Sequence, residues 1–182
     1  SYPTNGLNMP HGVINDPHVF VAIDPDGTVT IVAHRSEMGT GSRTSLPMII
    51  ADEMEADWDK VKIVQAPGDE PKYGNQDTDG SRSLRHHIQP AREIGAAVRR
   101  MLEQPAADQW RTTIDEVDAN GHQPLPKTLA DRIGYAELPE AAIVLPTPPA
   151  DAPYLKDASA FRLLGQRQVH ITRLQHIRTR TA

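Results

Sequence analysis

The sequence predicts an α+β domain, in which a β-hairpin and additional strands form a small mixed sheet packed against two main helices. β-branched residues around a Pro-Asp-Gly turn predict the hairpin over residues 19–34, because proline presets φ and glycine accepts positive φ. Apolar residues at helical spacing predict helices over 42–56 and 84–104, and a short run rich in valine and isoleucine predicts a strand over 61–66. Alternation in the hairpin places three side chains on one face: Val29, Ile31 and Ala33.

Each predicted helix has an apolar face and a start or stop signal. The first begins at Ser42 as N-cap, and its apolar face consists of Leu46, Ile49, Ile50 and Met54. An acidic run around its end is expected to be a solvated helix face: Asp52, Glu53, Glu55, Asp57 and Asp59. The second helix is expected to stop at Pro105, and its apolar stripe consists of Ile88, Ile94, Val98, Met101 and Leu102.

The chain is long enough for one ordinary domain with appendages. Its predicted parts are an extended arm at 1–17, an α+β domain at 18–145, a proline-rich linker at 146–165 and a basic tail at 166–182. Late in the domain, a short strand at 116–119 precedes an Asn120-Gly121 hairpin turn, and a short helix is predicted over 135–145.

Composition narrows the function classes. The chain has 182 residues, no cysteine and a net charge of −5. Without cysteine, it holds no disulfide, thiolate metal site or iron–sulfur cluster of its own. Its negative charge argues against nucleic-acid binding, and its apolar runs are too short to span a membrane. The histidines show no ligand spacing, since the adjacent His86 and His87 diverge on a helix, so no metal site is predicted.

Two glycine-containing turns are the candidate ligand-binding features. Each precedes a helix N-terminus, where free backbone N–H groups favour an anionic ligand. The predicted cofactor-binding residues come from both turns: Gly39, Thr40, Gly41, Gly80, Ser81, Arg82 and Ser83. Gly-x-Gly alone is also common in tight turns that bind nothing. Glu37, directly before the first turn, is interpreted as a buried, hydrogen-bonded carboxylate that braces it.

Several uncommon strings occur here in the order found in one known family. They are Gly12-Val13-Ile14-Asn15-Asp16-Pro17, His34-Arg35-Ser36-Glu37-Met38-Gly39-Thr40-Gly41, Ala51-Asp52-Glu53-Met54-Glu55-Ala56-Asp57-Trp58, Gln65-Ala66-Pro67-Gly68-Asp69 and Gly74-Asn75-Gln76-Asp77-Thr78-Asp79-Gly80-Ser81. Over residues 12–165 the chain resembles the N-terminal molybdopterin-binding region of the molybdenum hydroxylase (xanthine dehydrogenase/aldehyde oxidase) large subunit. It is most similar to the branch of isoquinoline 1-oxidoreductase beta subunits and related aldehyde dehydrogenases.

The resemblance implies a molybdopterin-dependent oxidoreductase of aldehydes or N-heterocycles, with an iron–sulfur small subunit as partner. In that family the string Glu-Met-Gly-Gln-Gly sits at the molybdenum site, where its glutamine hydrogen-bonds the metal-oxo group, and Thr40 stands at the position of that glutamine here. The resemblance also implies that the family's catalytic glutamate lies downstream of the matched region. We therefore expect a truncated cofactor-binding region, a homo-oligomer that binds no cofactor by itself and is not competent for hydroxylation alone.

Localisation is left open, because the family is often periplasmic and the chain shows no export signal. Two other functions also remain open from the residues alone. One is a small serine hydrolase, an esterase or lactonase, although no Gly-x-Ser-x-Gly elbow is present. Its nucleophile, base and orienting acid would come from Ser81, Ser83, His86, His87, Asp77 and Asp79. The other is an oligomeric interaction module without catalysis, in which the basic tail pairs with an acidic surface.

Overall fold

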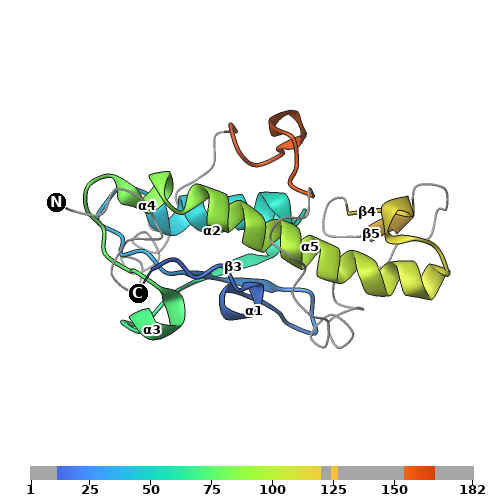
Figure 1. The fold of residues 1–182 in the computed structure, drawn as a ribbon, viewed down its shortest axis with the longest axis horizontal. Helices are drawn as coiled ribbons and strands as arrows, with labels where there is room; N and C mark the ends of the chain where they lie inside the picture. The colour runs from blue at the N-terminus through green and yellow to red at the C-terminus, as the bar shows by residue number, and fades with distance from the viewer. Residues whose placement is uncertain (1–11, 120–123, 127–153, 167–182) are drawn as a thin grey trace, which may run out of the picture.

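The computed structural model describes residues 12–119, 124–126 and 154–166. A three-stranded sheet in the order β1–β2–β3 forms its base (Figure 1). β1 (Val21–Ile23) pairs antiparallel with β2 (Val29–Ala33), which confirms the predicted hairpin. β3 (Val61–Gln65) runs parallel to β2, which confirms the predicted strand and makes the sheet mixed.

Two main helices pack on this sheet, and the predicted α+β class is confirmed. α2 (Ser42–Glu53) and α5 (Ile88–Trp110) lie side by side in Figure 1. The side chains of β2 alternate between buried and half-buried, and the buried ones are those predicted. The helices bury most of their predicted apolar faces, α2 against the sheet and α5 mainly against α2: Leu46, Ile49, Ile50, Met54, Ile94, Val98, Met101 and Leu102. Removing this apolar surface from water is the main driving force for the fold.

A glycine lets the two helices approach closely. A Cβ added to Gly95 would press on the Ile50 carbonyl oxygen and lie 2.7 Å from the Glu53 Cβ. Real side chains do not tolerate such a distance, so any larger residue would push α5 away from α2. Because the helices are close here, α5 lies against Glu53 at the end of α2, which belongs to the acidic run.

The second predicted helix has different ends in the structure. α5 continues past Pro105 to Trp110, because Ala106 and Ala107 are fully buried and their packing outweighs the one backbone hydrogen bond that proline removes. At the other end, a separate short helix, α4 (Arg82–Arg85), precedes α5. Ile88 therefore lies in the first turn of α5, where it is 46% exposed and outside the apolar stripe to which it was assigned.

The first predicted strand is shorter than expected, because α1 (Pro17–Phe20) takes its first residues. The Asp16 carboxylate caps this turn by accepting the His18 N–H, and proline occupies the first helical position. Phe20 is consequently turned into the core, where it is fully buried against the ring of His34. A capping signal thus outweighs β-branched propensity here.

Several short elements complete the described chain. They are α3 (Glu70–Tyr73), the 3-10 turns η2 (Trp58–Lys60), η3 (Ile114–Glu116) and η5 (Ala158–Ala160), and the strands β4 (Val117–Ala119) and β5 (Pro124–Pro126). β4 confirms the predicted short strand and pairs antiparallel with β5. The Asn120-Gly121 turn, the helix at 135–145, residues 1–11 of the arm, 146–153 of the linker and the tail beyond 166 lie outside the described residues.

The acidic run at the end of α2 is buried, which corrects the prediction of a solvated helix face. Asp52 and Glu53 are 0% exposed, and Glu55 is 7% exposed. Residues 154–166, called the latch segment below, lie against them, above the helices in Figure 1 and away from the sheet. Only the last member of the run, Asp59, is exposed as predicted.

The latch segment supplies both cations and backbone donors to these carboxylates. The Asp52 carboxylate accepts the backbone N–H groups of Arg162, Leu163 and Leu164 at 2.8–3.0 Å, and it pairs with Lys156 at 3.0 Å. Burial alone would raise the pKa of Asp52, but these N–H groups and the ammonium outweigh it and lower the pKa below its usual value. More than a hundred residues separate these partners, so local patterning could not reveal them.

Candidate functional site

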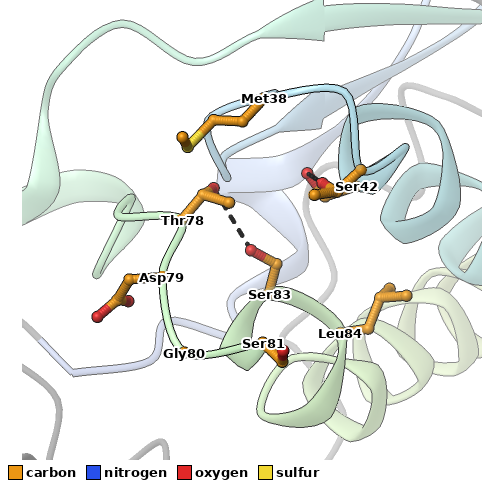
Figure 2. A pocket seen from close by; sticks show the side chains of 9 residues that line it. Met38, Ser42, Thr78, Asp79, Gly80, Ser81, Ser83 and Leu84 are labelled. Atoms are coloured by element: carbon orange, nitrogen blue, oxygen red, sulfur yellow. Dashed lines mark hydrogen bonds between the residues drawn. The ribbon is translucent and has the colours of Figure 1, made fainter.

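The two glycine turns meet around one cavity of about 440 Å³ (Figure 2). The first turn, between β2 and α2, contributes Met38, Thr40 and Ser42. The second turn, before α5, contributes Thr78, Asp79, Gly80, Ser81, Ser83 and Leu84. The structure therefore brings together most of the residues that the sequence singled out, although about forty positions separate the two turns.

Glu37 holds the first turn in shape. Its carboxylate accepts the backbone N–H groups of Gly39 at 2.6 Å, Gly41 at 3.0 Å and Arg43 at 3.0 Å. This confirms that Glu37 braces the turn, although the residue is half-buried rather than buried. It also corrects the expectation that these N–H groups are free for a ligand, because the carboxylate already uses them.

The N-cap of α2 also differs from the prediction. Gly41, not Ser42, is the N-cap, with φ of 83° in the left-handed region that favours glycine. With its amides bound to Glu37, the first turn presents hydroxyls to the cavity instead. Thr40 and Ser42 lie 3.4 Å apart there, hydroxyl to hydroxyl.

The second turn is shaped by two consecutive left-handed residues, Gly80 at φ of 49° and Ser81 at φ of 56°. The Arg82 backbone N–H then bonds to the Asp79 carbonyl at 2.9 Å, and the Arg82 guanidinium forms an ion pair with the Asp79 carboxylate. Arg82 is consequently directed away from the cavity lining, whereas Ser81 and Ser83 line it. Of the predicted cofactor residues, Gly39, Gly41 and Arg82 shape the turns rather than line the cavity.

Arg35 lies behind the second turn and was not singled out as a site residue. It is 0% exposed, and its Nη1 donates to the Asn75 carbonyl at 2.6 Å and to the Asn75 side chain. Its Nε donates to the Ser83 Oγ at 3.3 Å. The sequence signal that could have pointed to Arg35 is its position directly after an apolar strand. A charged residue is rarely buried there unless other groups bind it.

The loop that carries Asn75 is fixed by a buried amide. The Gln76 side chain donates to the carbonyls of His34 and Pro67 and accepts the Asp69 N–H. Thr78 then donates its hydroxyl proton to the Ser36 carbonyl, which joins the second turn to the exit of β2. Both walls of the cavity are therefore anchored to the same strand end.

The buried rings of His34 and His87 contact one another, with centroids 4.9 Å apart and planes inclined at 57°. Burial lowers the pKa of His34 to about 3 and that of His87 to about 4, so both rings are neutral at pH 7. Each also feels the nearby Arg35 cation, which lowers the pKa further.

The geometry gives no serine–base pair. Within residues 12–119, neither the Ser81 nor the Ser83 hydroxyl hydrogen-bonds to a histidine ring, and the Ser83 hydroxyl instead accepts the Arg35 Nε–H. This geometry therefore does not support the hydrolase alternative. In the part of the chain that the structure describes, histidine, aspartate and glutamate form no cluster suited to a metal ion, and no helix is both long and apolar enough to cross a bilayer.

The cavity is large enough for a small-molecule ligand that forms hydrogen bonds. Its volume lies in the range of small-molecule sites, and hydroxyls from both turns line it. Met38 and Leu84 are exposed, at 71% and 40%, and add apolar surface at its edge.

Comparison with known proteins identifies the family. The model of the molybdopterin cofactor-binding domain matches residues 3–171, which is most of the chain. The chain belongs to the molybdopterin cofactor-binding domain family. The resemblance inferred from the motifs is thus confirmed.

Two curated relatives agree with this membership. Isoquinoline 1-oxidoreductase subunit beta of Brevundimonas diminuta is 34% identical over 128 residues, covering 67% of this chain and 16% of the relative. The membrane-bound aldehyde dehydrogenase [pyrroloquinoline-quinone] of Gluconacetobacter polyoxogenes is 36% identical over 166 residues, covering 85% of this chain and 20% of the relative. The chain therefore spans a fifth or less of these proteins.

Solved structures agree on the fold. Quinoline 2-oxidoreductase from Pseudomonas putida 86 superposes with a TM-score of 0.55 and 22% identity, over 68% of this chain and 16% of that one. The Cu,Mo-CO dehydrogenase superposes with a TM-score of 0.55 and 23% identity, over 65% of this chain and 15% of that one. At this identity the likeness establishes the fold of the matched region alone.

Proposed function

We propose that this chain supplies one wall of the molybdopterin site in the large subunit of an oxidoreductase that acts on aldehydes or N-heterocycles. The observation that carries the proposal is the convergence of two turns, distant in sequence, on one cavity of about 440 Å³. Family membership gives the cofactor class, and the names of the two curated relatives suggest the substrate classes.

In place of the expectation that the chain binds no cofactor by itself, we propose that hydroxyls of both turns hold it. Thr40 and Ser42 would contact it from the first turn, and Ser81 and Ser83 from the second. When bound, molybdopterin supplies the metal at which electrons are transferred. A threonine hydroxyl is shorter than the glutamine amide usual at position 40, so Thr40 would reach less far toward that metal.

We further propose that the chain does not hydroxylate a substrate by itself. Its match covers 16% and 20% of the two curated relatives, so most of their residues have no counterpart here. An iron–sulfur partner subunit would carry electrons away, since the chain has no cysteine to bind such a cluster. Self-association into a homo-oligomer remains a prediction, and the mass of the chain under native conditions tests it.

Cofactor content tests the proposal. The full chain is produced in a bacterium that makes molybdopterin, and the purified protein is assayed for molybdenum and for the fluorescent product of pterin oxidation. Thr40→Trp places an indole in the cavity and is expected to reduce pterin content at least tenfold. Lys62→Trp, on the exposed face of β3, is the control and should retain the wild-type content.

Two results would contradict the proposal. Wild-type protein with no more pterin than an unrelated protein would refute binding, and equal pterin in Thr40→Trp would place the ligand elsewhere. Dye-linked oxidation of an aldehyde by the chain alone, with stoichiometric molybdenum, would refute the claim that it needs further segments.

A further inference from the structure

Arg35 carries a buried positive charge without a carboxylate in contact. Among the described residues it makes no ion pair, and its Nη2 has no hydrogen-bond partner. Burial and the nearby Arg82 lower the pKa of Arg35, while Asp77, Asp79 and Glu70 act in the opposite direction. An arginine stays protonated in proteins, and a buried cation is costly unless an anion compensates it.

The hydroxyl of Ser83 connects this cation to the cavity. Its oxygen accepts the Arg35 Nε–H at 3.3 Å on one side and lies 3.4 Å from the Thr78 Oγ1 on the other. Thr78 already donates its only hydroxyl proton to the Ser36 carbonyl, so between these two hydroxyls Ser83 is the donor. Figure 2 shows the two side chains pointing toward one another at the cavity wall.

The Ser83 hydroxyl proton therefore points toward Thr78 at the cavity wall. At 3.4 Å between the two oxygens, this hydrogen bond is longer than usual. A ligand oxygen at normal hydrogen-bond distance would be a better acceptor than Thr78. The Arg35 charge behind the hydroxyl strengthens that donation and favours an oxygen that carries negative charge.

We propose that Arg35 is a positioning residue for the ligand of this cavity: it fixes Ser83 as a donor and makes the cavity select an anionic oxygen at that place. The inference rests on the proposed function only in taking molybdopterin as the natural ligand. A second probe, inorganic phosphate, tests the same chemistry independently of the cofactor.

The experiment measures phosphate binding by calorimetry and pterin content of the purified full chain. Arg35→Met, of similar length and uncharged, should lower phosphate affinity at least tenfold, and Arg35→Lys should recover part of the loss. Lys62→Met is the control, because Lys62 is an exposed cation on β3 outside the cavity lining, and it should change affinity less than threefold.

A double-variant comparison separates positioning from a structural role. Because Arg35 is argued to act through Ser83, adding Arg35→Met to Ser83→Ala should cause little further loss of affinity. Ser83→Ala keeps the charge and both Asn75 bonds, so it tests the proposal even if Arg35→Met fails to fold. Wild-type affinity in Ser83→Ala, or additive losses in the double variant, would overturn the proposal.

The two proposals fail separately. Phosphate binding that depends on Arg35 and Ser83, in a chain that holds no pterin, supports the positioning role and refutes the cofactor. Pterin binding that is unchanged in Arg35→Met and Ser83→Ala supports the cofactor and refutes the positioning role. A wild-type chain that binds neither probe refutes both.

Discussion

Glu37 shows how one side chain can define a turn and also limit what that turn offers a ligand. Three backbone amides converge on its carboxylate, so the first turn is rigid before any ligand arrives. Rigidity of this kind reduces the entropy lost on binding. As a consequence, the N–H groups of Gly39, Gly41 and Arg43 are not available to a ligand, and the hydroxyls of Thr40 and Ser42 line the cavity instead.

Replacing this carboxylate tests its role. Glu37→Gln removes the charge and leaves one acceptor oxygen for three amides, so the free energy of unfolding should fall by about 1–3 kcal/mol. Urea denaturation measures the change. Asp24→Asn, an exposed position in the hairpin turn, is the control and should stay within about 0.5 kcal/mol of wild type. An unchanged midpoint in Glu37→Gln would contradict the bracing role.

Only some of the individual site residues could be predicted from the sequence. Glu37 and the serines of the second turn stand beside glycines, a local signal that a single sequence displays. Arg35, Asn75 and Gln76 form their bonds across some forty residues, so their roles depended on how β2 and the second turn meet in space.

Among the elements, the latch segment links the chain's late residues to the end of α2. Its backbone donors and cations match buried carboxylates on one helix end, and Arg99 of α5 donates to the Glu53 and Tyr154 carbonyls nearby. The acidic run resembles a solvated face in sequence because nothing local distinguishes an exposed carboxylate from one whose partner lies a hundred residues away.

Breaking this contact should free the latch segment. Asp52→Asn leaves three backbone N–H groups facing an amide and Lys156 with a weaker partner, so stability should fall by about 3 kcal/mol or more. Trypsin should then cleave after Lys156 and Arg162 faster than in wild type. Asp59→Asn, from the exposed end of the same run, should do neither. Equal cleavage in both variants would contradict the account of the latch.

The close contact between α2 and α5 gives a second test. Gly95→Ala places a methyl group against Ile50 and Glu53, and the forced separation should cost about 1–3 kcal/mol. Gly68→Ala is the matched control, because a Cβ there meets nothing within 4 Å. Thermal unfolding compares the two, and a stable Gly95→Ala variant would mean that the helices are free to move apart.

For the molecule as a whole, the buried histidines predict acid sensitivity. The folded chain holds His34 and His87 neutral, with pKa values of about 3 and about 4, whereas an unfolded histidine titrates near 6.5. Below pH 6.5 the unfolded state binds more protons, so stability is complete above that pH and falls as the pH drops toward 4. The slope is about 1.4 kcal/mol per pH unit for each histidine.

Urea denaturation midpoints measured between pH 7 and pH 5 report this loss of stability. This pH range lies above the usual pKa of carboxylates, so the histidines dominate the change. His87→Gln removes one of the two buried rings and should reduce the slope substantially. His86, whose pKa is also lowered by burial and by its arginine neighbours, acts in the same direction and will leave a residual slope. A flat profile in the wild-type chain would contradict the burial of these rings.

The fold class, the hairpin, β3 and both main helices could be predicted because each has a local period or turn signal. The ends of α5, the cap of α1 and the latch depended on tertiary packing, which overrides local propensity. The pocket was predicted as two turns that share a ligand, and the structure brings them to one cavity.

The most direct test of that cavity is a spectrum of methionine methyl groups. Met38 lines the cavity and is 71% exposed, whereas Met54 and Met101 are buried in the core. In chain labelled at its methionine methyls, added molybdopterin should shift the Met38 resonance, assigned with Met38→Leu, and leave those of Met54 and Met101 unchanged. Bound cofactor with an unmoved Met38 signal would contradict the account.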